Sequence, residues 1–112
     1  MELLILFGIA AAIAKACSKK QDASEFDSVF CETGTRYAFD HKLVNGEWRA
    51  YIKRQPSYRG HSEDLHSTHR HRDARGYYVC WSEPIKSRTD SEAIADEWAK
   101  STEKYIQTGK KF

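Results

Sequence analysis

Residues 37–54 read YAFDHKLVNGEWRAYIKR, and this stretch decides the fold. At its centre, residues 45–46 (Asn-Gly) lie between runs in which apolar and polar side chains alternate. This pattern predicts two antiparallel strands joined by a two-residue type I′ turn. Such a turn fixes the register, because residues at equal distances from it face each other. The expected pairs are Val44 with Glu47, Leu43 with Trp48, His41 with Ala50, Phe39 with Ile52, and Tyr37 with Arg54.

The predicted hairpin has two unlike faces, because successive side chains of a strand point to opposite sides. One face is apolar and carries Tyr37, Phe39, Leu43, Trp48, Ala50 and Ile52. The other face is polar and mostly basic, and carries Arg36, Asp40, Lys42, Arg49, Tyr51, Lys53 and Gln55. We expect the apolar face to be buried, and Arg49 and Lys53 on the basic face to be open to a partner.

A third strand and a helix are predicted after the hairpin. Residues 76–81 (GYYVCW) are rich in strand formers. Residues 89–92 (TDSE) match a capping box, and the apolar residues that follow them recur at helical spacing as far as Gly109, a typical C-cap. The sequence therefore predicts an α+β domain over residues 34–112, in which a small three-stranded antiparallel sheet (ββ–loop–β) is packed by one C-terminal helix.

This order of elements is similar to that of DNA-binding domains built from a three-stranded sheet and one helix. Such domains occur in a class of plant transcription factors and as the arm-binding domains of phage integrases. The strand GEWRAYIK at residues 46–53 carries the similarity. In those families the exposed sheet face lies in the major groove, so the similarity implies a DNA contact through Arg49, Tyr51 and Lys53.

The chain begins with an apolar run, MELLILFGIAAAIAKA, at residues 1–16. Its hydrophobicity predicts a membrane-anchor helix over residues 1–18, which is marginal in length at a rise of about 1.5 Å per residue. Lysines follow the run rather than precede it, and this charge bias favours a cytoplasmic position for the rest of the chain. Residues 19–33, rich in polar side chains, are predicted to be a polar tether.

The sequence Ala-Cys-Ser at residues 16–18 also resembles the end of a bacterial lipoprotein signal. In that interpretation Cys17 carries the lipid and the domain lies in the periplasm, although Lys15 stands where a small or apolar residue is expected. Cys31 and Cys80 would then remain as one possible disulfide. In a cytoplasmic domain we expect the same two cysteines to be reduced, buried thiols.

Positive charge is concentrated in the middle of the chain. Residues 21–47 carry six acidic and two basic side chains, whereas residues 48–76 carry three acidic side chains and seven arginines or lysines. Residues 57–75 (SYRGHSEDLHSTHRHRDAR) are predicted to be one loop, and loops of this length are usually functional or disordered. The candidate binding residues of this loop are Arg59, His61, His66, His69, Arg70, His71, Arg72 and Arg75.

Three chemistries suit these side chains. Arginines bind phosphates and carboxylates through paired N–H donors, and histidines add positive charge near pH 6. His66, His69 and His71 could hold zinc in a metal-dependent hydrolase, but their spacing matches no named zinc motif. Residues 66–68 (His-Ser-Thr) resemble the His-x-Thr element of two-histidine phosphoesterases, a family that needs two such elements where this chain has one.

The preferred hypothesis is a bacterial, membrane-tethered interaction module without enzymatic activity. It would bind an anionic partner or surface, such as a protein or lipid headgroups, through the predicted Arg/His loop and the basic sheet face. The alternatives are a nucleic-acid-binding ββ–βα domain and a hydrolase that uses the histidines with zinc. No other cofactor is expected.

Overall fold

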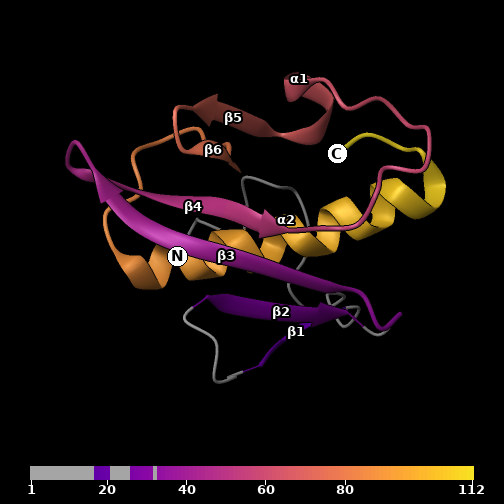
Figure 1. Cartoon of the computed structure of the whole chain (residues 1–112), viewed down its shortest axis with the longest axis horizontal. Coiled ribbons are helices and arrows are strands. Elements are labelled where there is room, and N and C mark those ends of the chain that lie inside the picture. Colours follow the sequence, from indigo (N-terminus) through magenta and orange to yellow (C-terminus); the bar gives the residue numbers. More distant parts are fainter. Residues whose placement is uncertain (1–16, 21–25, 32) are drawn as a thin grey trace.

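A six-stranded antiparallel sheet, in the strand order β1-β2-β3-β4-β6-β5, packs against one long helix (Figure 1). The structure is a computed structural model and describes residues 17–20, 26–31 and 33–112. Its elements are β1 Cys17–Lys20, β2 Asp27–Cys31, β3 Arg36–Val44, β4 Glu47–Arg54, α1 Leu65–Thr68, β5 Arg70–Asp73, β6 Gly76–Val79 and α2 Arg88–Thr108. In Figure 1, α2 runs behind β3 and β4, and the opposite side of these strands is the outer face. The predicted α+β class is confirmed.

The hairpin of β3 and β4 forms as the sequence predicts. Its turn residues 45–46 have φ angles of 52° and 85°, both in the left-handed region that a type I′ turn needs. Four expected pairs are confirmed: Val44 with Glu47, Leu43 with Trp48, His41 with Ala50, and Phe39 with Ile52. The fifth is wrong, because Lys53 is an extra residue in β4 and Ala38 rather than Tyr37 lies opposite Arg54.

The sheet is larger than the three strands expected. Where a polar tether was expected over residues 19–33, the structure has the end of β1 and the whole of β2. The polar composition of β2 is misleading because Asp27 has a partner inside the fold, the ring of His41. Val29 on the same strand is fully buried.

The expected loop of residues 57–75 contains two regular elements. The Asp64 side chain caps α1 by accepting a hydrogen bond from the Ser67 N–H at 3.1 Å. The strand β5 then pairs with β6 to form a second hairpin beside β4. The strand expected at residues 76–81 is therefore confirmed in part, as β6, which ends at Val79.

The helix α2 begins earlier than the sequence predicts. Its N-cap is Ser87 rather than Thr89, and the Ser87 hydroxyl accepts a hydrogen bond from the Asp90 N–H at 3.0 Å. Its C-cap is Gly109, as expected, with a φ of 75° and an N–H that donates to the Tyr105 carbonyl. The helix therefore spans 21 residues and covers much of the sheet.

The core lies between α2 and the apolar face of the β3–β4 hairpin. The fully buried Trp98 meets the rings of Tyr37 and Phe39 edge to face, with centroids 6.0 and 5.9 Å away. Its indole N–H donates to the Thr68 carbonyl at 3.0 Å, which ties α2 to α1. The predicted burial of this face is confirmed for Tyr37, Phe39 and Ala50. Trp48 and Ile52 are only partly buried, and Leu43 beside the turn is 58% exposed.

The apolar run of residues 1–16 lies outside the described residues. Within the part of the chain that the structure describes, no helix is long and apolar enough to cross a membrane. Cys17 and Ser18 belong to β1, so the anchor helix expected over residues 1–18 does not include them.

The cysteines differ from both expectations. Cys31 is disulfide-bonded, whereas Cys80 is free. A Cys31–Cys80 disulfide is therefore not formed, and Cys31 is not the reduced thiol expected of a cytoplasmic domain. The backbone of Cys17 lies directly opposite that of Cys31 in the register of β1 and β2. Burial raises the pKa of the Cys80 thiol.

Candidate functional site

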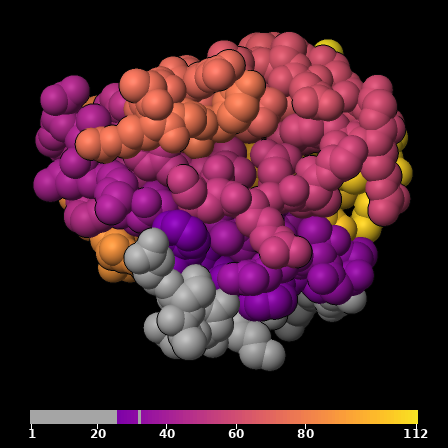
Figure 2. Space-filling model, in the orientation of Figure 1, coloured from indigo at the N-terminus to yellow at the C-terminus, as the bar shows by residue number. Residues whose placement is uncertain are grey.

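Four exposed basic side chains lie on β4 and on the β5–β6 hairpin beside it, and we term them the cationic patch: Lys53, Arg54, Arg72 and Arg75. Lys53 and Arg54 line one hollow together with Tyr77 of β6. The Arg72 guanidinium stacks on that same Tyr77 ring, and Arg75 stacks on the ring of Tyr51, two residues before Lys53. Figure 2 looks onto this side of the molecule, with β5 and β6 (salmon to orange) beside β4 (pink).

The cationic patch keeps its positive charge. Among the described residues, none of its four members forms an ion pair. Three stack on aromatic rings at 5.2 to 6.0 Å, which orients a cation without neutralising it. Four other basic residues have acidic partners: Lys42 with Asp40, Arg49 with Asp73, Arg88 with Glu92, and Lys100 with Asp96. The exposed Lys86, Lys104, Lys110 and Lys111 have no ion pair among the described residues.

Asp73 holds the β5–β6 turn against β4. One carboxylate oxygen accepts hydrogen bonds from the Tyr51 hydroxyl at 2.6 Å and from the Arg49 guanidinium at 2.7 Å. The other oxygen accepts from the backbone N–H of Arg75 at 2.8 Å. These donors, the Tyr51 hydroxyl above all, lower the pKa of Asp73. The Asp73 carboxylate thus positions the backbone of Arg75, two residues further along the turn.

The basic sheet face is less open than the sequence suggests. Tyr51 is only 2% exposed, and the Arg49 side chain is 18% exposed and is paired with both Glu47 and Asp73. Of the three residues that the similarity to DNA-binding domains implies, only Lys53 remains exposed and without an ion pair among the described residues. Of the implied DNA contacts, Arg49 and Tyr51 are therefore engaged within the fold and Lys53 alone is accessible.

The histidines of the predicted loop do not converge. The His61 ring donates to the Ile106 carbonyl at 3.1 Å, and the His69 ring donates to the Phe112 carbonyl. His71 stacks on Tyr78 on the outer face, while His66 is exposed on α1. Within the described ranges, no group of three or more metal-binding side chains could hold an ion, so the zinc interpretation has no geometric support.

Two arginines of the predicted loop lie apart from the cationic patch. Arg59 is exposed and has a φ of 54°, and it lines a different hollow, next to Glu103. Arg70 is only 6% exposed and is enclosed by Tyr58 and Tyr77. Neither location is evident from the sequence, because both depend on how the segment after β4 folds back.

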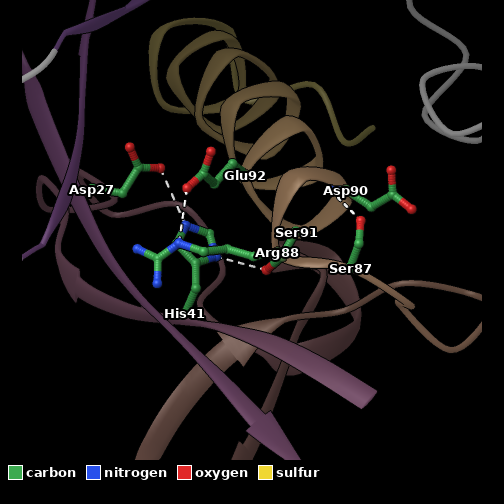
Figure 3. A network of polar contacts seen from close by, with 7 residues as sticks. All are labelled: Asp27, His41, Ser87, Arg88, Asp90, Ser91 and Glu92. Atoms are coloured by element: carbon green, nitrogen blue, oxygen red, sulfur yellow. Dashed lines mark hydrogen bonds and ion pairs between the residues drawn. The ribbon is translucent and has the colours of Figure 1, made fainter. Parts of the chain in front are cut away.

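A buried polar network of Asp27, His41 and Ser91 joins β2, β3 and α2 (Figure 3). The Nδ1 atom of His41 lies 2.6 Å from the Ser91 hydroxyl, and Nε2 lies 3.1 Å from the Asp27 carboxylate. The residue types match a catalytic triad, but the His41 side chain is 0% exposed and Ser91 is fully buried, so no substrate can reach the hydroxyl. The sequence gives one indication of this network, which is that His41 lies in register with apolar residues of the predicted hairpin.

No protein-family model, curated protein or solved structure matches this chain. No solved structure therefore supports the similarity to DNA-binding domains built from a sheet and one helix. The chemistry of the cationic patch and its surroundings is what points to a function.

Proposed function

We propose that this domain is an interaction module that binds an anionic partner or surface through the cationic patch. The observation that carries the proposal is the collection of four exposed cations without an ion pair among the described residues. Residues 21–112 hold 15 basic and 15 acidic side chains, so the patch is a local excess in a neutral domain. An unpaired group of like charges is stabilised by an external anion.

The side chains of the patch suit phosphate, carboxylate and sulfate groups. Three of the four members are arginines, and two of these, Arg72 and Arg75, stack on tyrosine rings. An arginine fork can give two parallel hydrogen bonds to one oxyanion. Each basic residue near an anionic surface contributes about 1 kcal/mol to binding at low ionic strength. Four such residues give a useful but salt-sensitive affinity.

In this proposal the apolar run of residues 1–16 supplies the membrane contact and the domain is held next to a charged surface. The disulfide at Cys31 favours an oxidising compartment for the domain, because disulfides are rare in the cytosol. This reverses the side of the membrane expected from the lysines that follow the run. In a bacterial protein, the periplasm is the oxidising compartment that agrees with this disulfide.

The test compares two full-length variants of equal net charge. One replaces the cationic patch (K53Q/R54Q/R72Q/R75Q), and the control replaces four exposed lysines elsewhere (K86Q/K104Q/K110Q/K111Q). We expect the wild type and the control to bind immobilised heparin and phosphatidylserine vesicles alike. The patch variant should elute from heparin at clearly lower salt, because it has lost four exposed cations that lie on β4 and the adjoining β5–β6 hairpin.

Circular dichroism of each variant shows whether the fold is kept. If the two quadruple variants elute together, net charge alone explains retention and the proposal fails. If a duplex oligonucleotide binds far more tightly than heparin or the vesicles, the partner is a nucleic acid instead.

A further inference from the structure

Arg70 is a buried cation without an acidic partner. The residue is 6% exposed, and no carboxylate of the described residues lies within ion-pairing distance of its guanidinium. An arginine cannot lose its proton to relieve this burial. Leaving a buried charge uncompensated is costly, so a negative charge next to this guanidinium would be stabilising.

The bonds that Arg70 does make hold the guanidinium in place. Its Nε donates to the Thr68 hydroxyl at 2.9 Å, and its Nη2 donates to the Glu63 carbonyl at 2.9 Å. The ring centroids of Tyr77 and Tyr58 lie 4.1 and 5.2 Å from its central carbon. These contacts hold the guanidinium in place through Nε and Nη2. Arg49, by contrast, satisfies its charge with Asp73.

A hollow of about 610 Å³ adjoins this guanidinium, and we term it the Arg70 pocket. Its charged lining consists of three cations and one carboxylate: Lys53, Arg54, Arg70 and Glu63. The remaining walls are largely apolar or aromatic, with Ile52, Pro56, Tyr58 and Tyr77 among them. The volume is within the range of pockets that hold small organic ligands.

Tyr58 lies beside Arg70 in the wall of the pocket. It is 3% exposed, and its buried hydroxyl has no hydrogen bond of good geometry among the described residues, although Gln55 and Thr68 lie close enough to it to oppose the rise that burial causes in its pKa. A buried hydroxyl normally has a partner, because an unsatisfied one costs about 1–3 kcal/mol. An oxyanion beside Arg70 could accept a hydrogen bond from this hydroxyl.

We infer that the Arg70 pocket binds the phosphate group of a phosphomonoester, with Arg70, Arg54 and Lys53 around the phosphate and Tyr77 beside the organic part. The inference rests on the proposed function for the sign of the ligand's charge and names its chemical group. A dianion fits better than a carboxylate, because the charged lining has an excess of two positive charges. The tyrosine and aliphatic walls favour a phosphate carried on an organic body over inorganic phosphate.

The experiment follows the side-chain Nε–H signal of Arg70 by NMR in the full-length chain. The probes are phenyl phosphate, inorganic phosphate and benzoate. Inorganic phosphate lacks the aromatic ring, and benzoate has the ring but a singly charged carboxylate in place of the phosphate. We expect phenyl phosphate to give a saturable shift, with inorganic phosphate and benzoate each binding at least about threefold more weakly. Absence of a saturable shift, or equal binding of benzoate, overturns the inference.

Variants locate the effect. Arg54→Gln should weaken phenyl phosphate binding roughly three- to tenfold, while Lys86→Gln, a distant exposed control, should leave it unchanged. Arg70→Lys lacks the Nε–H, so its binding is followed through the backbone amide signal of Tyr77. This variant should bind at least tenfold more weakly, since hydrogen bonds to a charged group are lost. Should Arg70→Lys fail to fold, Arg54→Gln decides: equal affinities of Arg54→Gln and Lys86→Gln overturn the inference.

Heparin retention separates this inference from the proposed function. Arg70 is buried, so Arg70→Lys should still bind heparin through the cationic patch. Loss of phenyl phosphate binding with heparin binding kept shows that Arg70 serves the pocket and not the patch, although the two share Lys53 and Arg54. If the wild type binds heparin but not phenyl phosphate, the inference about the pocket fails and the proposed function stands. If it binds phenyl phosphate but not heparin, the proposed function fails and the inference about the pocket stands.

Discussion

Arg49 and Arg70 both lie against tyrosine rings, but they differ in whether a carboxylate balances their charge. Arg49 stacks on Tyr78 and is neutralised by Asp73, whereas Arg70 is enclosed by two tyrosines and has no carboxylate partner. The surrounding contacts, rather than the residue type, therefore decide which arginine can bind a ligand. The sequence presents Arg49 on the sheet face and Arg70 in the predicted loop alike as candidate binding residues, because the acidic partner of Arg49 lies 24 residues away.

Asp73 is the residue on which the order of the β5–β6 turn depends. Its lowered pKa arises mainly from the Tyr51 hydroxyl, so the stabilisation from its carboxylate is fully present above the ordinary aspartate pKa of about 3.9. The stabilisation is lost as the pH falls below that value and through the lowered pKa of the folded state. We therefore predict that Asp73→Asn unfolds at lower urea concentration than the wild type at pH 7, with a difference that shrinks below about pH 4.

Urea unfolding followed by tryptophan fluorescence at several pH values measures this difference. Asp40→Asn is a matched control, because Asp40 is partly exposed on β3 and its ion pair with Lys42 is long, at 3.7 Å. A stability difference for Asp73→Asn that stays constant down to pH 2.5 would show that the carboxylate charge is not what stabilises the turn.

At the scale of elements, the β3–β4 hairpin and α2 follow local rules, whereas β5 does not. The turn at residues 45–46 and the cap at Gly109 are set by nearby residues, so the sequence predicts them. The strand β5 contains arginine and histidine, which favour strands only weakly. It forms because Arg70 and Arg72 stack on Tyr77 across the hairpin. The partners that stabilise β5 become visible only when the chain is folded.

Trp98 links α2 to α1 and so to the segment that builds the Arg70 pocket. We predict that Trp98→Phe lowers the free energy of unfolding by roughly 1–3 kcal/mol, because the buried Thr68 carbonyl loses its donor. Amide hydrogen exchange should also speed up in residues 65–70. Chemical denaturation and exchange mass spectrometry measure the two effects.

Trp48→Phe is the control, since Trp48 is only partly buried. It should be less destabilising and should leave exchange in residues 65–70 unchanged. Equal effects of the two substitutions would mean that the indole N–H of Trp98 does not anchor α1.

For the whole molecule, the disulfide at Cys31 determines how stability responds to redox conditions. We predict that a reductant lowers the free energy of unfolding of the wild type and of Cys80→Ser equally, by about 2–4 kcal/mol. Cys31→Ser should already have this lower stability and should not respond to the reductant. Urea unfolding with and without dithiothreitol provides the measurement; a wild type insensitive to reductant would argue against an oxidising compartment.

The sequence predicts the architecture of this molecule better than its site. The apolar hairpin face and the stripe containing Trp98 are periodic, so their packing against each other follows from pattern alone. The site depends on side chains that are distant in sequence, such as Arg70 with Tyr58 and Lys53 with Tyr77. The histidines, which the sequence makes prominent, separate because each finds a different partner after residue 57 folds back.

The central claim is that the four unpaired cations of the patch form the binding surface. The most direct test is the affinity of the two charge-matched quadruple variants for a heparin oligosaccharide, measured from 50 to 300 mM NaCl. Each lost contact to a polyanion lowers the dependence of log affinity on log salt. We predict a shallower dependence and weaker binding for K53Q/R54Q/R72Q/R75Q, and wild-type behaviour for K86Q/K104Q/K110Q/K111Q. Equal slopes and affinities for the two variants would contradict the account.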